Sequence, residues 1–358
     1  MARKKKEVPK ENGTITREEL LDALTLVKPA VGGSDCISEI LTHFAFDGKN
    51  VMANNEYAFI STPLKLDVEC TVVADPFFKL VNGIPAQELS LNMSGTELAL
   101  KTNSIKSKFR TLEIREFSKP SKFSSAGKRI PVNFFDALKL CLKTVIKDKT
   151  DPLFRSIAVA NGDMVSSDKV RLSFYPLTED MPDMLIPLEA AEVILSLRDQ
   201  ILNYSLVKEA KWDSWIGFNL STEGILTAKL MEGAYPVNRT HLKLSEYTQD
   251  LNFPPEIKDT IERCKYFSTG LDKVERNIVN IEIAKGKMTC SLQNPQLGDF
   301  SEVLDIDSKL DTILAINLDH LEDVTQITLT SKLSPTNPNT ILFYNDSMPY
   351  QQLISLEG

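Results

Sequence analysis

Basic side chains at a regular spacing are the residues of this sequence best suited to bind a ligand. In the segment 134–149, Lys139, Lys143 and Lys147 recur at steps of four residues, and Lys149 follows them. Residues four apart share one face of an α-helix, so these lysines would form a basic stripe that contacts phosphate groups without reading sequence. A solvated helix face would show the same pattern, and that interpretation stays open.

A second predicted helix, in the stretch FPPEIKDTIERCKYFSTG, carries Lys258, Arg263 and Lys265 beside an apolar face. Two basic helices favour phosphate contact more than one helix does. The predicted helix at 187–202 has Arg198 as its basic residue and two glutamates, so the basic surface would be uneven.

The residue types that usually catalyse reactions or hold metals are scattered. The three histidines lie far apart, and no glycine-rich phosphate loop or serine-hydrolase motif is present. The odd number of cysteines and the lack of a CxxC pair argue against a disulfide framework: Cys36, Cys70, Cys141, Cys264 and Cys290. We expect no metal, no cofactor and no enzymatic activity, although catalytic groups can meet in space without a sequence signature.

Composition indicates an ordinary globular protein, with 42% hydrophobic and 25% charged residues. No apolar run approaches the ~18 residues of a membrane span, and the N-terminus has no apolar core for a secretory signal. We expect a disordered basic tail over 1–13, no membrane contact and a cytoplasmic location; contact of the tail with an anionic partner is the alternative. The net charge of −8 argues against a simple nucleic-acid binder, so DNA contact would need local basic patches.

Six strand–turn–strand signatures divide the chain. Glycine, asparagine and aspartate tolerate the positive φ of tight hairpins. The predicted turns are Asp47-Gly48, Ser94-Gly95, Asn161-Gly162, Glu223-Gly224, Lys285-Gly286 and Pro335–Asn339. Alternate turns recur after about 120 residues, an ordinary domain size, which predicts three copies of a unit with two hairpin halves.

A helix signature accompanies each half. Thr16 and Glu19 form a capping-box pattern before the first helix. Asp75 is a predicted N-cap, with Pro76 at the first helical position. The segment 134–149 is predicted to be the longest amphipathic helix. The run Gly233-Ala234-Tyr235-Pro236 closes the second unit as a domain junction.

Three such units resemble the bacterial DNA sliding clamp, the β subunit of the replicative polymerase, over about residues 14–356. ADPFFKLVNGIPAQELSLNMSGTELALKTNSIKSKFRTL is similar to a first-domain segment of that family. VSSDKVRLSFYPL resembles its T-D-G-x-R-L-A strand, and KLMEGAYPVNRT its L-x-x-G-x-F/Y-P junction. The family's glycine and histidine are Lys169 and Val170 here, the junction's second aromatic is Asn238, and the end reads LISLEG, so the pocket is expected to take a different peptide.

The resemblance implies an α+β fold of three tandem clamp domains, each of two βαβββ halves, with helices lining a ring and sheets outside. The domains would span 14–127, 128–238 and 239–358. A head-to-tail homodimer would encircle double-stranded DNA without sequence preference and tether the replicative polymerase, while polymerase and clamp loader bind through short peptide motifs. The divergence suits a bacteriophage-encoded member, acting in a bacterial cell or an infected host.

The resemblance also implies roles for individual residues. The DNA-facing set is Lys139, Lys143, Lys147, Lys149, Arg198, Lys258, Arg263 and Lys265. The partner-peptide pocket is Phe154, Ser167, Asp168, Arg171, Leu172, Pro236, Leu353, Ile354 and Ser355. The dimer contact is Tyr266 and Phe267. Phe154 and Leu172 are equally well interpreted as core residues, and Pro236 as part of a turn.

Two other functions stay open. A clamp-like ring could serve as an interaction platform for transcription or recombination factors, which the weak basicity of several helices keeps in view. An unrelated multi-domain β-rich enzyme would need a buried polar cluster with strongly shifted ionisation in a deep pocket.

Overall fold

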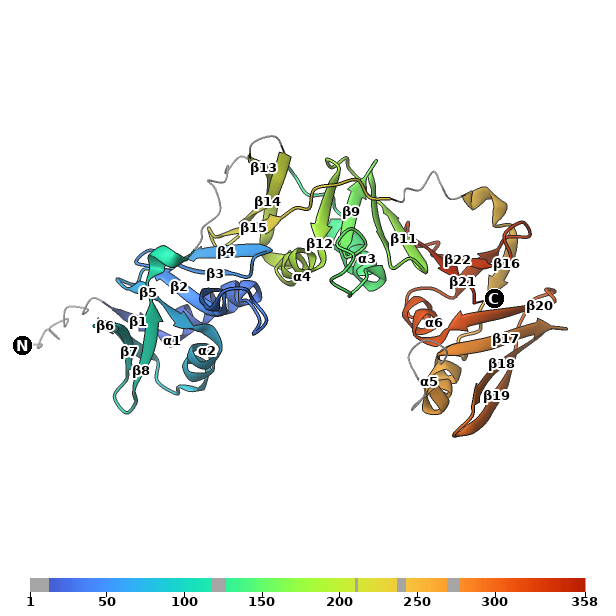
Figure 1. Cartoon of the computed structure of the whole chain (residues 1–358), viewed down its shortest axis with the longest axis horizontal. Coiled ribbons are helices and arrows are strands. Elements are labelled where there is room, and N and C mark those ends of the chain that lie inside the picture. Colours follow the sequence, from blue (N-terminus) through green and yellow to red (C-terminus); the bar gives the residue numbers. More distant parts are fainter. Residues whose placement is uncertain (1–12, 118–126, 210–211, 237–242, 269–276, 358) are drawn as a thin grey trace, which may run out of the picture. The chain divides into compact units, whose positions relative to one another are not determined.

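The structure is a computed structural model that describes residues 13–117, 127–209, 212–236, 243–268 and 277–357 (Figure 1). Most of the predicted tail 1–13, and the junction residue Asn238, therefore lie outside the described residues. The α-helices of the described part are α1 (Arg17–Val27), α2 (Ala74–Gly83), α3 (Phe134–Cys141), α4 (Leu188–Ser196), α5 (Ile257–Ser268) and α6 (Leu318–Thr325). None of these is long and apolar enough to cross a membrane.

The chain forms two compact units, each built from two separate stretches of sequence. Unit 1 comprises residues 1–130 and 186–232, and unit 2 comprises 131–185 and 233–358. The predicted middle domain, 128–238, contributes to both units. The three predicted domain boundaries stay a prediction.

Unit 1 contains one 11-stranded sheet in the order β1-β6-β7-β8-β5-β2-β3-β4-β15-β14-β13. Its strands are β1 (Thr14–Thr16), β2 (His43–Asp47), β3 (Asn50–Asn54), β4 (Ala58–Pro63), β5 (Glu69–Val73), β6 (Glu88–Ser94), β7 (Glu97–Lys101), β8 (Lys106–Leu112), β13 (Ile201–Glu209), β14 (Trp212–Leu220) and β15 (Ile225–Lys229). Helices α1 and α4 both pack against β4, and α1 also contacts α2. Two distant parts of the sequence meet where β4 pairs with β15.

Unit 2 contains an eight-stranded sheet, β12-β9-β10-β11-β23-β22-β21-β16, and a four-stranded sheet, β19-β18-β17-β20. The larger sheet has β9 (Ser156–Ala160), β10 (Asp163–Ser167), β11 (Arg171–Pro176), β12 (Met184–Pro187), β16 (Gln249–Asn252), β21 (Thr330–Leu333), β22 (Thr340–Tyr344) and β23 (Gln351–Ser355). The smaller has β17 (Ile278–Ala284), β18 (Lys287–Asn294), β19 (Gly298–Asp305) and β20 (Thr312–Asn317). Helix α5 packs on β18, β19 and α6, and α3 packs on β10 and β11.

The order of elements along the chain confirms the predicted repeat. A helix followed by three strands occurs six times: after α1, α2, α3, α4, α5 and α6. All six predicted turns connect antiparallel strands. At Asn161-Gly162 both residues have positive φ, 53° and 80°, and at Lys285-Gly286 the values are 52° and 76°. Positive φ at both central residues is the geometry that two-residue hairpins require.

The first helix begins as predicted, but the second does not. The Thr16 hydroxyl accepts a hydrogen bond from the Glu19 backbone N–H at 3.2 Å. Helix α2 begins at Ala74, so the prediction of Asp75 as N-cap was wrong. Strand β5 runs to Val73 and leads directly into the helix, which puts Asp75 inside the first turn. There its carboxylate pairs with Lys79 at 2.8 Å.

Helix α3 is much shorter than the predicted 134–149. It ends at Cys141 and is followed by a 3-10 turn, Leu142–Thr144, while Val145 is extended. The hydroxyls of Thr144 and Ser166 donate to the Cys141 carbonyl at 3.2 and 2.7 Å, and Val145 is buried. These contacts direct the chain away from the helix axis, so α5, not α3, is the longest of the described helices.

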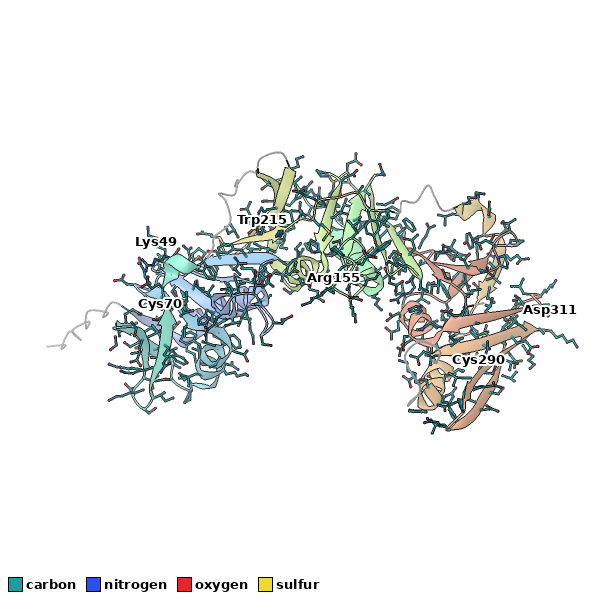
Figure 2. All side chains as sticks on the ribbon, viewed as in Figure 1. Lys49, Cys70, Arg155, Trp215, Cys290 and Asp311 are labelled. Atoms are coloured by element: carbon teal, nitrogen blue, oxygen red, sulfur yellow. The ribbon has the colours of Figure 1, made fainter. Side chains whose placement is uncertain are left out.

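The interior of each unit is filled with apolar side chains. Figure 2 draws the described side chains on the ribbon and labels Cys70 and Cys290. All five cysteines lie in the described part, and none of them forms a disulfide there. Burial raises the pKa of Cys70, Cys141 and Cys290 to about 12. Such thiols behave as small apolar core groups and not as nucleophiles.

Candidate functional site

The junction between β11 and β23 brings together residues from distant parts of unit 2. The strands pair antiparallel, with Arg171 opposite Ile354 and Leu172 opposite Leu353. The Ser355 backbone N–H extends the pairing by donating to the Val170 carbonyl at 2.9 Å. Most of the predicted pocket residues therefore lie side by side.

A tight turn precedes β11 and fixes the position of its first residue. The Asp168 carboxylate accepts from the backbone N–H groups of Val170 and Arg171 at 3.1 and 2.5 Å. The Ser167 hydroxyl donates to the Arg171 carbonyl at 2.7 Å. Lys169 has a φ of 75°, a left-handed conformation that costs energy for residues other than glycine and asparagine.

The Arg171 guanidinium, buried in the junction, uses its donors within the protein. Its Nε donates to Asp168 at 2.7 Å, and its two Nη atoms donate to Asp323 and to the Lys143 carbonyl, each at 2.8 Å. Arg171 thus ties β11 to α6 and to the turn after α3. Its place is in the framework of the junction, and not on an open pocket wall.

His320 of α6 faces the same cluster, and sequence reasoning missed it. Burial and the neighbouring Arg171 lower the pKa of His320, against the opposing effect of nearby carboxylates. Its Nδ1 is buried and has no hydrogen-bond partner among the described residues. Nothing in the local pattern of α6 marks His320 or Asp323, because both meet Arg171 only through the fold.

Phe154 lies between an aromatic ring and a cation. The Tyr235 ring meets it edge-on, with centroids 5.8 Å apart and an interplanar angle of 62°. The Lys169 ammonium lies 5.2 Å from the Phe154 centroid and 2.6 Å from the carboxylate of Asp151. Pro236, next to Tyr235, is exposed.

The remaining pocket residues differ in exposure. Leu172 and Ile354 are buried, at 9% and 0% exposed, so they contribute mainly to the core. Leu353 and Ser355 are partly exposed at the edge of the same strand. The surface left for a ligand consists of Phe154, Pro236 and Leu353, with the polar turn beside them.

Unit 1 contains a second copy of the turn before β4. Asn55 accepts from the N–H groups of Tyr57 and Ala58 at 3.2 and 2.8 Å, and Glu56 has a φ of 76°. The Lys229 N–H of β15 donates to the Tyr57 carbonyl at 2.7 Å, as Ser355 does to Val170. The turn and its strand pairing are therefore features of the repeated fold.

What distinguishes the unit 2 copy is its charge. Ala58 stands where Arg171 stands in the other turn, so unit 1 has no equivalent of the bonds to Asp168 and Asp323 at that place. A repeated element that gains a buried ion cluster in one copy has a specific use for it. The unit 2 junction is thus the stronger candidate site.

The predicted lysine stripe does not exist as one helix face. Lys139 is exposed on α3, Lys143 lies in the 3-10 turn, and Lys147 and Lys149 are exposed in the following loop. The ammonium groups of Lys139, Lys143 and Lys147 form no ion pair with any residue that the structure describes. They remain able to bind an external anion, as a cluster at the end of α3.

Two of the three cations of α5 already form ion pairs within the protein. Arg263 forms a two-pronged ion pair with Glu302, at 2.9 and 2.7 Å, and holds the pKa of that carboxyl below its usual range. Lys265 pairs with Glu322, whereas Lys258 is exposed. In unit 1, Arg198 lies in a 3-10 turn, not on the predicted helix, 3.6 Å from Asp199. Over the six described α-helices, acidic residues outnumber basic ones by two to one.

The two predicted dimer residues differ in how far their side chains are exposed. Tyr266 is 70% exposed on α5. Phe267 packs against the unit 2 core and against Phe300, with ring centroids 5.5 Å apart. Only Tyr266 is therefore a surface candidate.

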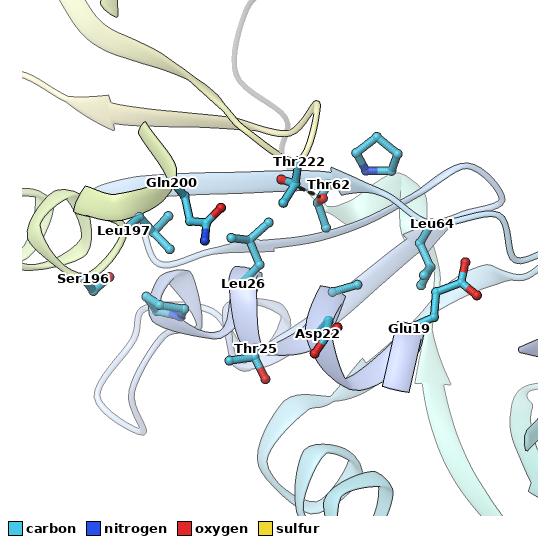
Figure 3. Close-up of a pocket in the computed structure, with 13 residues that line it drawn as sticks. Glu19, Asp22, Thr25, Leu26, Thr62, Leu64, Ser196, Leu197, Gln200 and Thr222 are labelled. Carbon is cyan, nitrogen blue, oxygen red and sulfur yellow. Dashed lines mark hydrogen bonds between the residues drawn. The ribbon is translucent and has the colours of Figure 1, made fainter. Parts of the chain in front are cut away.

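A cavity of about 710 Å³ lies in unit 1, between α1, the end of β4 and the turn after α4 (Figure 3). Leu26, Leu197 and Gln200 line it, with the carboxylates of Glu19 and Asp22 on the α1 side (Figure 3). Its lining contains no predicted site residue and no histidine, cysteine or lysine. The described residues also contain no group of histidine, cysteine and carboxylate side chains suited to hold a metal ion.

No protein-family profile and no curated protein sequence matches the chain. Solved structures match it along almost its whole length. The DNA polymerase III β-subunit sliding clamp from Bartonella birtlesii, bound to griselimycin, is 16% identical, covers 97% of this chain and 99% of its own, and has a TM-score of 0.81. A putative β subunit from Eubacterium rectale is 16% identical, with the same coverage and a TM-score of 0.80.

The DNA polymerase III β subunit from Thermotoga maritima is 14% identical, covers 97% of this chain and 99% of its own, and also has a TM-score of 0.80. The order of elements in this chain, one helix followed by three strands six times over, agrees with the predicted clamp halves. The chain therefore has the fold of the bacterial DNA polymerase III β subunits.

Proposed function

We propose that the protein is a DNA sliding clamp, a ring of two chains that encircles duplex DNA and holds the replicative polymerase on it. The observation that carries this proposal is the match over 97% of this chain and 99% of the matched β subunits. A whole-length match leaves no part of the architecture unaccounted for. The clamp would act by binding and not by catalysis, and the bacteriophage origin remains a prediction.

Two strands with an open edge support ring closure: β19 is the last strand of its sheet, and β8 pairs with β5 only at Thr111 and Leu112. Within each unit, the last strand of one half pairs with the last strand of another: β4 with β15, and β11 with β23. The corresponding strands β19 and β8 form no such pair in the described chain. Pairing β19 of one chain with β8 of a second chain would repeat the junction twice and close a head-to-tail dimer.

The chemistry of the two strands fits this pairing. The exposed residues of β8 include Lys106, Lys108 and Arg110, whereas the exposed residues of β19 include Asp299 and Asp305. A similar turn precedes β19, with Asn294 accepting from the Gln296 and Leu297 N–H groups at 2.8 and 3.1 Å, although Pro295 does not have the positive φ of Glu56 and Lys169. Leu297 and Val303 are 52% and 56% exposed there, and a partner strand would cover them.

Reversing charge on β8 is expected to open the ring. In Lys106→Glu with Arg110→Glu, acidic β8 would face acidic β19, and like charges across an interface disfavour association. Light scattering should show the mass falling from twice 40.1 kDa toward 40.1 kDa. The control is the double variant Lys49→Glu with Lys65→Glu. Both lysines are exposed elsewhere in unit 1, and the change in net charge is the same.

A complementary chain makes the experiment specific. Asp299→Lys with Asp305→Lys reverses the charge of β19, and mixing it with the β8 variant restores opposite charges at both junctions of a mixed ring. The mixture should regain the two-chain mass that each variant alone has lost. A β8 variant that stays dimeric, or a mixture that stays monomeric, would show that these strands do not form the interface.

DNA, the polymerase and a clamp loader are the proposed partners. The basic cluster at the end of α3 would meet DNA phosphates, with Lys258 as a second contact. Short peptides of polymerase and loader would dock at the β11–β23 junction, against Phe154, Pro236 and Leu353. Griselimycin, to which the Bartonella clamp is bound, is a further ligand to test for competition with such peptides.

The excess of acidic residues on the helices favours a second candidate. A ring whose helices repel phosphate would serve better as an interaction platform for transcription or recombination factors. The two functions differ in one property: a DNA clamp must bind duplex DNA with an affinity that falls with salt. A ring without such binding would be the platform.

A further inference from the structure

We propose that Lys169 selects partner peptides that carry a carboxylate beside their apolar anchor. The inference rests on the proposed peptide site and adds the chemistry of its ligand. Lys169 covers Phe154 in the free chain, and an acidic peptide residue would take this lysine from Asp151 while the anchor contacts the ring.

The first observation is the position of the ammonium group. It lies 5.2 Å from the centroid of Phe154 and 2.6 Å from Asp151. Tyr235 already packs against Phe154 edge-on. An apolar anchor that contacts the remaining ring surface must therefore displace Lys169.

The second observation is that the fold does not need a lysine here. Glu56, with a φ of 76°, makes the same turn in unit 1 that Lys169, with a φ of 75°, makes in unit 2. Both side chains reach back to the loop before the first hairpin strand, where the Glu56 carboxylate accepts from the Ile37 N–H at 3.1 Å. The same turn thus forms with a negative side chain in unit 1 and a positive one in unit 2. The turn does not require the positive charge of Lys169, so this charge can act in ligand recognition.

The third observation concerns the cost of opening. The Lys169 and Asp151 side chains are 56% and 28% exposed, and an ion pair so open to water contributes little to stability. Arg171, the nearby cation, is held by Asp168 and Asp323 and cannot follow an incoming carboxylate. Lys169 therefore has a positive charge in contact with Phe154 that can leave its partner at little cost, and it lies beside the exposed Val170.

Binding of two matched peptides tests the proposal. The probes are labelled octapeptides with leucine and phenylalanine anchors, identical except for aspartate or asparagine beside the phenylalanine. The full chain should bind the aspartate peptide about tenfold more tightly in low salt, because a charge-assisted bond forms with Lys169. In Lys169→Gly the preference should disappear, and the asparagine peptide should bind more tightly than to the unmodified chain.

Lys285→Gly is the matched control. Lys285 also has a positive φ, 52°, but lies in the β17–β18 hairpin away from Phe154. Both glycine variants relieve the same kind of backbone strain, so only a direct role for Lys169 changes the peptide preference. Lys169→Gln, which keeps a polar side chain without the charge, should also lose the preference.

The outcomes separate this proposal from the one it rests on. Two results would refute the inference: equal binding of both peptides to the unmodified chain, or a preference that survives in Lys169→Gly. In either case Lys169 only holds the loop through Asp151, and the proposed peptide site is unaffected. If neither peptide binds the unmodified chain, the peptide site itself is refuted, and the inference with it.

Discussion

Arg171→Met is expected to lower the free energy of unfolding of unit 2 by about 3 kcal/mol, because breaking a buried ion cluster leaves its carboxylates without a counter-charge. Asp168 would lose its cation in a nearly buried position, where its side chain is 15% exposed. Asp323 and the Lys143 carbonyl would lose a donor as well. Methionine keeps much of the volume of arginine, so the effect reports the bonds and not a cavity.

Hydrogen exchange in urea, read along β11 and β23, measures this effect. Trp215 belongs to β14 in unit 1, so its fluorescence reports the unfolding of the unit that does not carry the substitution. Arg115→Met is the control, because its ion pair with Glu113 is exposed and such a pair contributes less than about 1 kcal/mol. Unaltered exchange in β11 and β23 would show that Arg171 does not hold the junction.

Changing Lys139, Lys143 and Lys147 together to glutamate is expected to remove most of the salt-dependent binding to duplex DNA. Each lysine that neutralises a phosphate contributes about 0.9 to the slope of log affinity against log salt, so the slope should fall by about 3. Affinity at low salt should fall further, since each glutamate adds repulsion. The measurement is DNA-binding anisotropy over a series of salt concentrations.

The control for this variant is the triple change Lys49→Glu, Lys65→Glu and Lys101→Glu. These lysines are exposed in unit 1, and the change in net charge is the same. A slope that falls equally in both variants would mean that only net charge matters. A slope unchanged in the α3 variant would remove the cluster from the DNA contact and favour the interaction platform.

Local signals predicted the repeated fold well. The turns Asn161-Gly162 and Lys285-Gly286 need positive φ, and their residue types indicate it directly. Spacing between such turns then gave three copies of one unit. Chain order alone fixes these features, because each hairpin forms between neighbouring segments.

The same reasoning failed where side chains from distant segments decide the outcome. Lysines at steps of four continued the pattern of α3 past its end, but the Ser166 hydroxyl helps to end the helix at Cys141. On α5, Arg263 is neutralised by Glu302, which lies on β19. No local pattern could show either contact.

The candidate site was found only in part. The resemblance placed Ser167, Asp168 and Arg171 near the C-terminal strand, and the pairing of β11 with β23 brings them together. It gave no sign of Asp323 or of the contact between Lys169 and Phe154. Both depend on how loops and α6 fold back on one turn, which sequence spacing does not encode.

Topological retention on DNA tests the central claim most directly. High salt would first weaken the charged β8–β19 contacts and open the rings. Nicked circular DNA would then be added and the salt diluted, so that rings close around the DNA. The account predicts that protein stays with the circles through gel filtration at moderate salt and is released when one cut makes the DNA linear. Protein that leaves circular and cut DNA alike, or that stays on both, would contradict the proposal that this chain forms a sliding clamp.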